Sequence, residues 1–178
     1  MNDEALIDEC ITGNARAQKS LFDRFSPKMM GVVLRYVNDR ERANDVLQDA
    51  FIKVFQNLTT FKKDGSLEGW VRRIVVNTAL DYLRRNKKYL GHTEITDISL
   101  AASKSSDAIG KLEEESLLGI IQSLPEGYRM IFNLYAIEGY SHKEIADQLG
   151  ISENTSKSQY SRAKTAIQKL LEKYGIER

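Results

Sequence analysis

The sequence is poor in the residues that build covalent cross-links and metal sites. Among its 178 residues there are one cysteine, Cys10, and two histidines, His92 and His142. A single cysteine excludes an intramolecular disulfide and a thiolate metal cluster, and it fits a reducing compartment. The sequence also has no glycine-rich phosphate loop, no Ser-His-Asp set and no histidine–carboxylate spacing of a metal site. We therefore expect no metal, no cofactor and no catalytic residue.

Proline, strand-like alternation and long apolar runs are scarce as well. The only prolines are Pro27 and Pro125, and apolar and polar residues rarely alternate, so the chain is predicted to be all-α. No apolar run approaches the length that spans a membrane. The chain starts with the acidic sequence Met-Asn-Asp-Glu, which does not resemble a signal peptide. We expect a soluble, cytoplasmic protein.

The net charge is only +1, but the basic residues are concentrated in two stretches. Residues 72–88 contain six lysines and arginines against a single acid, Asp81. Residues 157–169 contain four such residues and no acid. Two separated basic stretches indicate two contacts with a polyanion such as nucleic acid. Each stretch alone also fits a solvated helix face.

The last third of the chain contains the pattern of a helix-turn-helix. Ser141 and Glu144 form a capping box that starts a short helix, and Gly150 suits the left-handed conformation that ends it. Ser152 then caps a long helix with a regularly spaced apolar face. The residues of that face are Tyr160, Ala163, Ile167 and Leu170. A second helix placed in this way can lie in the DNA major groove.

Polar and basic residues occupy the other face of this long helix. Lysine and arginine neutralise phosphates or reach guanine edges, and glutamine pairs with adenine. The candidate DNA-reading residues are Asn154, Thr155, Lys157, Ser158, Gln159, Ser161, Arg162 and Lys164. Ser156 is the weak position, because it is polar on the side where an apolar residue packs better. A plain helical hairpin inside a core is the alternative.

The first half of the chain is predicted to be a helical bundle. Ala5, Leu6, Cys10 and Ile11 form one apolar stripe, which Gly13 ends. A helix opens at Ser26-Pro27, where serine caps and proline takes the first helical position. Its inward residues are Met30, Val33, Leu34 and Val37. A further helix is predicted over residues 40–58, followed by a loop over 59–66 and a helix over 67–85 that Ser66 caps.

Glycine and serine replace large apolar residues after residue 87, and this composition predicts a flexible linker. A second helical unit begins at Leu112, with Pro125 opening its next helix. Its inward residues are Leu117, Leu118, Ile121, Leu124, Ile131, Leu134 and Tyr135. We therefore predict two small helical domains, over residues 1–88 and 112–178, joined by a linker over residues 89–111.

The helix over residues 67–85 carries an aromatic residue, an amide and arginines beside an irregular loop. Trp70, Ile74 and Asn77 share one side at three- and four-residue steps. A π surface, an edge-reading amide and phosphate clamps are what holding an unstacked base requires. Phe61 in the preceding loop is a candidate wall of such a pocket. A buried tryptophan among surface arginines is the plainer alternative.

The helix over residues 40–58 has a core side and a mixed outer side. The outer residues are Asp45, Gln48, Asp49, Ile52 and Lys53. An exposed isoleucine among acids and an amide indicates a protein-binding face, although a solvated surface explains the same pattern.

These segments resemble bacterial RNA polymerase sigma factors. Residues 45–55 resemble the helix that binds core polymerase, and residues 70–85 resemble the promoter-melting helix. Leu124-Pro125, Arg129 and residues 144–163 resemble the C-terminal helix-turn-helix. The resemblance covers nearly the whole chain outside the linker. With no further domain between the two regions, the chain resembles the extracytoplasmic function (ECF) subgroup of the sigma-70 family.

The resemblance implies a transcription initiation factor with no active site of its own. Its implied partners are the β′ clamp helices and β flap of core RNA polymerase, promoter DNA and an anti-sigma factor. The implied core-binding residues are Asp45, Gln48, Asp49, Phe51 and Ile52. The implied contacts to the −10 element are Phe61, Lys62, Lys63, Trp70, Arg72, Arg73, Ile74, Asn77, Arg84 and Arg85. The candidate DNA-reading residues named above would contact the −35 element. The departures from the family pattern are Ser156, Gln159 and Lys164.

A protein of another class is the alternative to a sigma factor. A stand-alone helix-turn-helix regulator would use the N-terminal bundle to sense a ligand or to dimerise. Such a sensor needs a ligand cavity and has no use for a docking face over residues 45–55.

Overall fold

The computed structural model describes residues 3–62, 65–87 and 114–174, and every regular element in these residues is helical. The chain divides into two compact units, Met1–His92 and Thr93–Arg178, called unit 1 and unit 2 below. The prediction of an all-α protein with two helical parts is thus confirmed. The linker predicted over residues 89–111 lies outside the described residues.

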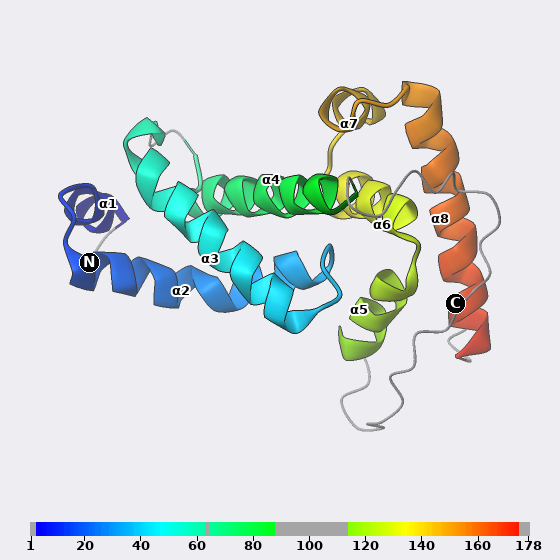
Figure 1. The fold of residues 1–178 in the computed structure, drawn as a ribbon, viewed down its shortest axis with the longest axis horizontal. Helices are drawn as coiled ribbons and strands as arrows, with labels where there is room; N and C mark the ends of the chain where they lie inside the picture. The colour runs from blue at the N-terminus through cyan, green and yellow to red at the C-terminus, as the bar shows by residue number, and fades with distance from the viewer. Residues whose placement is uncertain (1–2, 63–64, 88–113, 175–178) are drawn as a thin grey trace. The chain divides into compact units, whose positions relative to one another are not determined.

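Unit 1 is built from helices that pack on one another in pairs. Its elements are α1 (Asp3–Ile11), α2 (Ala15–Leu34), α3 (Arg40–Asn57), the short 3-10 helix η1 (Leu58–Thr60) and α4 (Leu67–Lys87). The long helices α2, α3 and α4 contact each other, and α1 lies against α2 (Figure 1). Asp39 caps α3 by accepting a hydrogen bond from the Arg42 amide at 2.8 Å.

Apolar residues at helical spacing fill the centre of unit 1. The largest fully buried side chains there are Tyr36, Phe51, Ile7, Leu21, Met29, Leu58 and Leu80. Burying a side chain of this size stabilises the fold by about 1.5–3 kcal/mol. The first apolar stripe differs from the prediction, because Ala5 and Ile11 are exposed and Ile7 takes the buried position beside Leu6 and Cys10.

The predicted helix start at Ser26-Pro27 is wrong. Helix α2 begins at Ala15 after an Asn14 cap and runs unbroken through Pro27. An interior proline lacks the amide that would bond the carbonyl four residues earlier, a cost of about 3 kcal/mol. Leu21, Phe25 and Met29 are all buried on one face of α2. Burial at four-residue spacing on both sides of Pro27 outweighs the missing hydrogen bond and keeps the helix continuous.

Unit 2 consists of shorter helices gathered on one long helix. Its elements are α5 (Glu114–Ser123), α6 (Glu126–Phe132), the π-helical segment η2 (Asn133–Ile137), α7 (His142–Leu149) and α8 (Glu153–Lys173). Helix α8 packs against α6 and α7. Leu124, Tyr128 and Ala163 form a buried cluster to which Phe132 and Ile167 add.

Two residues predicted to point inward in unit 2 are exposed. Leu117 lies on the open side of α5, where Ile120 and Ile121 take the buried positions. Tyr135 lies in η2, and its ring stacks on His142 with centroids 4.2 Å apart instead of entering the core. A π-helical turn changes the register of side chains after α6, which the regular 3.6-residue period used for the prediction does not include.

Among the described helices, none combines the length and the apolar content needed to cross a bilayer.

Candidate nucleic-acid interface

The start of the helix-turn-helix forms as the sequence predicts. Ser141 Oγ accepts a hydrogen bond from the Glu144 amide at 3.2 Å. Glu144 Oε2 in return accepts one from the Ser141 amide at 2.8 Å, which completes the capping box of α7. These bonds satisfy amides that have no partner inside the helix, so they fix where α7 begins.

The turn between the two helices also matches the prediction. Gly150 adopts the left-handed conformation with φ 67° and ψ 36° at the end of α7, a conformation that costs glycine little because it has no Cβ. Ser152 then caps α8 and accepts a hydrogen bond from the Thr155 amide at 3.0 Å. Helix, turn and second helix therefore follow the arrangement of a DNA-binding helix-turn-helix.

The candidate DNA-reading residues lie on the N-terminal half of α8. Most of them are exposed, and Thr155 and Gln159 are half-buried. Lys157 Nζ pairs with Glu153 Oε1 at 2.7 Å one turn earlier, and this cation lowers the pKa of the Glu153 carboxyl. Lys164 Nζ lies 5.1 Å from the centre of the Tyr160 ring. In the described structure both lysines thus have partners within α8.

Ser156, the weak position of the pattern, is fully buried with 0% of its surface exposed. Its hydroxyl forms a hydrogen bond of 2.9 Å with Nδ1 of His142, the first residue of α7. Burial, and then the nearby Lys157, lower the pKa of the His142 imidazole. The sequence analysis assigned no partner to Ser156, so this contact with His142 was missed. A buried hydroxyl requires a hydrogen-bond partner, so a serine on the inward side of the helix was the sequence signal that could have predicted such a contact.

Unit 1 places the predicted Trp70, Ile74 and Asn77 at one hollow, whereas Phe61, the predicted pocket wall, is not among the residues that line it. Trp70, Ile74 and Asn77 lie together on one side of α4, and the Phe61 ring lies 5.6 Å from the Trp70 ring between centroids. The hollow measures about 280 Å³. Its lining residues are Lys53, Asn57, Thr60, Trp70, Ile74, Asn77 and Thr78. The sequence therefore identified one wall of the hollow and missed the opposite wall, which α3 and η1 supply.

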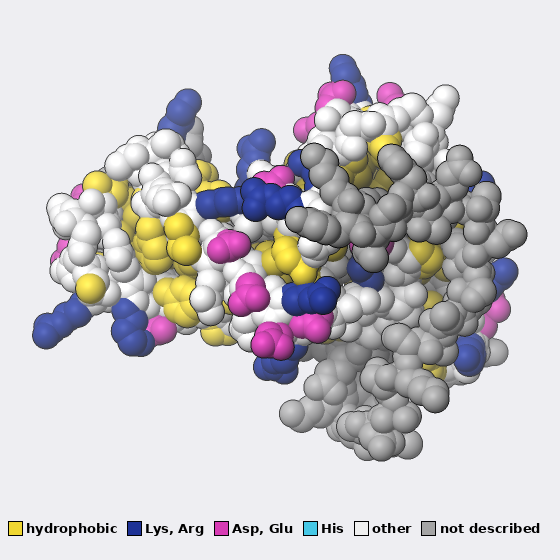
Figure 2. All heavy atoms as spheres, viewed as in Figure 1, with side chains coloured by type: hydrophobic (Ala, Val, Ile, Leu, Met, Phe, Trp, Pro, Cys, Tyr) yellow, Lys and Arg dark blue, Asp and Glu magenta, His cyan; other side chains and the backbone are white. Residues whose placement is uncertain are grey.

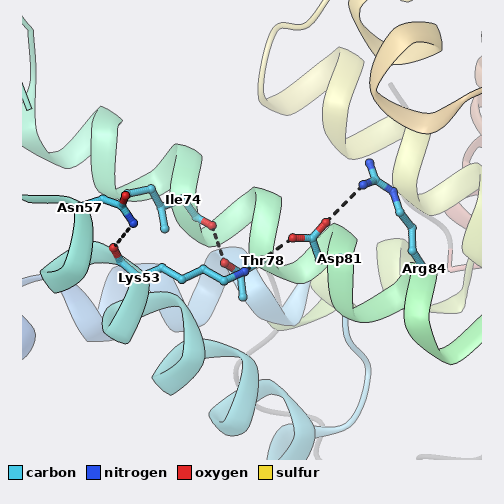
Figure 3. A network of polar contacts seen from close by, with 6 residues as sticks. All are labelled: Lys53, Asn57, Ile74, Thr78, Asp81 and Arg84. Carbon is cyan, nitrogen blue, oxygen red and sulfur yellow. Dashed lines mark hydrogen bonds and ion pairs between the residues drawn. The ribbon is translucent and has the colours of Figure 1, made fainter. Parts of the chain in front are cut away.

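An ion pair joins the two helices that supply the walls, and the other contacts drawn in Figure 3 each lie within one helix. Lys53 Nζ on α3 lies 3.5 Å from Asp81 Oδ2 on α4. The other Asp81 oxygen lies 3.2 Å from Arg84 Nη1. Within each wall, the Asn57 amide donates to the Lys53 carbonyl at 2.8 Å, and the Thr78 hydroxyl donates to the Ile74 carbonyl at 2.8 Å. Asp81 thus joins a pocket-lining cation to an arginine of the basic helix.

The described basic residues predicted to contact DNA lie on α4, except Lys62, which precedes it in the chain. Lys62, Arg73, Arg84 and Arg85 are exposed, and Arg72 is half-buried. Lys63 lies outside the described residues. Because Arg72 and Arg73 are adjacent on a helix, their side chains leave α4 about 100° apart. The arginines therefore cover more than one face of α4.

The outer side of α3 carries most of the predicted docking residues. Asp45, Gln48 and Asp49 are exposed, and 54% of the Ile52 surface is exposed among them. Figure 2 shows acidic side chains gathered along this helix. Asp45, Gln48, Asp49 and Ile52, called the α3 face below, form a mixed acidic and apolar surface.

Phe51 does not lie on the α3 face. It is only 2% exposed, and its ring meets the Phe22 ring edge-on with centroids 4.7 Å apart. Residues 51 and 52 of a helix point about 100° apart, so an outward Ile52 places Phe51 toward the core.

Two segments of the chain match family models. Residues 21–89 match sigma-70 region 2, and residues 114–167 match sigma-70 region 4. The ECF RNA polymerase sigma-E factor of Escherichia coli K12 is 30% identical over 178 residues, which cover 94% of this chain and 93% of that protein. The RNA polymerase sigma-H factor of Pseudomonas aeruginosa is 29% identical over 181 residues, covering 96% of this chain and 94% of that protein.

The chain belongs to the ECF group of the sigma-70 family. This ECF sigma factor is a transcription initiation factor, as its resemblance to the family implies. The alternative of a stand-alone regulator is not favoured. The family acts without catalysis of its own, by binding core RNA polymerase and promoter DNA.

Solved structures share the fold of this ECF sigma factor. The sigma factor RpoE, in complex with the anti-sigma factor NepR from Bartonella quintana, aligns with a TM-score of 0.55 at 22% identity, covering 86% of this chain and 96% of that one. CnrH, in complex with the cytosolic domain of CnrY, aligns with a TM-score of 0.51 at 24% identity, covering 96% of this chain and 97% of that one.

Proposed function

We propose that this sigma factor captures a flipped base of the −10 element in the hollow between α3 and α4. The observation that carries the proposal is the lining of that hollow, where Trp70, Ile74 and Asn77 lie side by side. An aromatic face stacks on a base, and an amide reads its edge. Both groups contact a single extruded base, so neither contact requires the surrounding DNA to remain double-stranded.

Base capture gives the protein a way to stabilise opened DNA. Taking a base out of the stack costs about a few kcal/mol, and stacking one base on an aromatic side chain returns about 1–3 kcal/mol. The two are of similar size, so pocket binding offsets most of the unstacking cost. Arginines of α4 and Lys62 supply phosphate contacts beside the hollow, and Lys63 belongs to the same proposed set.

The α3 face is the proposed docking surface for core polymerase. Acidic residues and Ile52 suit a basic partner surface with an apolar centre, and the family resemblance assigns this partner as the β′ clamp helices. Phe51 contributes by holding α3 in place from inside unit 1, since it is buried against Phe22. Unit 2 would meet the β flap.

The N-terminal half of α8 is the proposed reader of the −35 element. Arg162 and Lys164 suit phosphate or guanine contacts, and Gln159 suits adenine. The support for this assignment is the complete helix-turn-helix with Ser141, Gly150 and Ser152 in their predicted roles. We accordingly propose two domains: residues 1–88 for polymerase binding and the −10 element, and residues 112–178 for the −35 element.

We propose that the protein works in the cytoplasm, where its polymerase partner is, and that it has no catalytic residue. RpoE and CnrH are both seen bound to another protein, and NepR is an anti-sigma factor. By analogy, an anti-sigma factor would cover surfaces of this chain.

Asn77→Ala tests the base pocket. The variant loses the amide from the wall of the hollow while α4 keeps its fold, because Asn77 is exposed. We expect the holoenzyme to form normally and open-complex formation to fall by about tenfold, the loss of a hydrogen bond made only to the opened strand. Permanganate reactivity of unpaired thymines on a promoter selected with the wild-type holoenzyme measures opening.

Gln168→Ala is the matched control, since it removes an exposed amide from α8 beyond the proposed −35 residues. It should open the promoter as the wild type does. Equal permanganate reactivity of Asn77→Ala and the wild type would remove Asn77 from the pocket role.

A further inference from the structure

The helix-turn-helix contains a buried polar contact between its two helices. Ser156 lies in the first turns of α8 with no exposed surface, at a position where apolar packing was expected. Its hydroxyl bonds to His142 Nδ1 at 2.9 Å, from the first turn of α7. A hydrogen bond weakens steeply when its angle changes, whereas apolar packing tolerates sliding. This contact therefore restrains the orientation of α8 relative to α7 as well as the distance between the two helices.

The histidine makes a second contact that does not involve its hydrogen bond. Its ring stacks on Tyr135 of η2, with centroids 4.2 Å apart and planes 13° from parallel. The ring also lies 5.8 Å from Tyr160, one turn further along α8 than Ser156. The ring of His142 thus contributes packing, and its Nδ1 contributes a directional hydrogen bond to Ser156. Different substitutions can remove one of these contacts and keep the other.

The neighbours of Ser156 are candidate DNA-reading residues. Thr155 and Lys157 flank it in the chain, and each leaves the helix about 100° from it. With Ser156 held inward, the direction of both flanking side chains is set. A rotation of α8 by about 20° would move a side-chain end some 6 Å from the axis by about 2 Å, enough to break a hydrogen bond to a base edge.

We propose that His142 and Ser156 are a positioning pair for −35 recognition, which fixes the rotation of α8 about its axis relative to α7. The pair touches no DNA; it sets where the reading side chains point. The inference rests on the proposed role of α8 in reading the −35 element.

Two substitutions of His142 separate the hydrogen bond from the ring. His142→Phe keeps a ring against Tyr135 and loses the bond to Ser156. His142→Asn keeps a hydrogen-bonding atom near the Nδ1 position and loses the ring. Ser156→Ala removes the bond from the other side, with a smaller change in α7. Thr165→Val is the control, because it deletes an exposed hydroxyl of α8 that bonds only the Ser161 carbonyl.

The assay uses full-length protein with core polymerase on two templates. One is a promoter selected from a library with the wild-type holoenzyme, and the other has its −35 element scrambled. The ratio of transcripts from the two templates measures −35 discrimination. Thermal unfolding of each variant is followed by circular dichroism.

We expect His142→Phe and Ser156→Ala to lower the discrimination ratio by about fivefold, the equivalent of one hydrogen bond. His142→Asn and Thr165→Val should keep it. Stability should follow a different order, since His142→Asn loses the ring contact and should unfold at a lower temperature than His142→Phe. A purely structural pair would lower discrimination and stability together.

The outcomes separate the inference from the function on which it rests. If the wild type itself does not distinguish the templates, the proposed −35 role of α8 fails. If the wild type does distinguish them and His142→Phe and Ser156→Ala keep the ratio, only the positioning pair is refuted. Equal losses of discrimination in His142→Asn and His142→Phe would refute it as well.

Discussion

Ile52→Ala tests whether the α3 face binds core polymerase. Ile52 keeps 54% of its surface exposed in the free protein, although it is a large apolar residue, and it lies one turn after Asp49 on the same helix. Burying a whole isoleucine side chain is worth about 1.5–3 kcal/mol. Roughly half of that surface remains to be buried by a partner, and alanine retains Cβ, which leaves about 1 kcal/mol for the interface. The dissociation constant for core polymerase should therefore rise by about fivefold.

The measurement is a titration of fluorescently labelled protein with core polymerase at fixed salt concentration. Ile11→Ala is the matched control, since Ile11 is a 44% exposed isoleucine of α1, a helix that contributes no residue to the α3 face. Both variants should unfold at the wild-type urea midpoint, because neither residue is in the core. Wild-type affinity in Ile52→Ala, or an equal loss in Ile11→Ala, would refute the assignment of the docking surface to the α3 face.

Two further predictions concern the interior. Phe51→Ala should destabilise unit 1 by about 3–5 kcal/mol, because it leaves a cavity against Phe22. Urea unfolding, followed by the fluorescence of the single tryptophan, Trp70, measures this loss. A stable variant with weakened polymerase binding would instead make Phe51 a contact residue. Burial, and then Lys157, lower the pKa of His142 in the folded protein, so the unfolded chain binds more protons at mildly acidic pH. The contribution of neutral His142 to the stability of the fold is therefore complete above about pH 6.5 and is lost as the pH falls through the lowered pKa. Calorimetry between pH 5 and pH 8 should show this dependence in the wild type and less of it in His142→Phe; identical pH profiles would contradict it.

Local signals explain why the helix-turn-helix was predictable from sequence. Ser141 with Glu144, Gly150 and Ser152 each act through backbone groups within a few residues, so their effect does not depend on distant contacts. The apolar spacing of α8 gave the same result independently, with Ala163 fully buried. Agreement of caps and spacing is what made this part of the prediction accurate.

Long-range packing explains the failures. Ser26-Pro27 is a sound local signal for a helix start, yet buried residues on both sides keep α2 continuous. The far wall of the hollow was missed because Asn57 and Thr60 come from other elements than Trp70. Only the packing of α3 against α4 brings them together, and helical periodicity within one element carries no information about that packing.

The distribution of charge supports the expectation that this protein binds its promoter weakly without the polymerase. Its net charge is only +1, and several cations near the proposed DNA surfaces are matched by acids of the same unit. Asp81 lies near both Lys53 and Arg84, and Glu153 pairs with Lys157. Each contact to a phosphate by one of these cations competes with an existing ion pair, so less of its attraction to DNA becomes net affinity. Docking through the α3 face, as proposed, would add binding energy that does not depend on these charges, and it would raise the effective concentration of promoter DNA at α4 and α8. We therefore expect tight promoter binding to require both proposed DNA surfaces together with the polymerase.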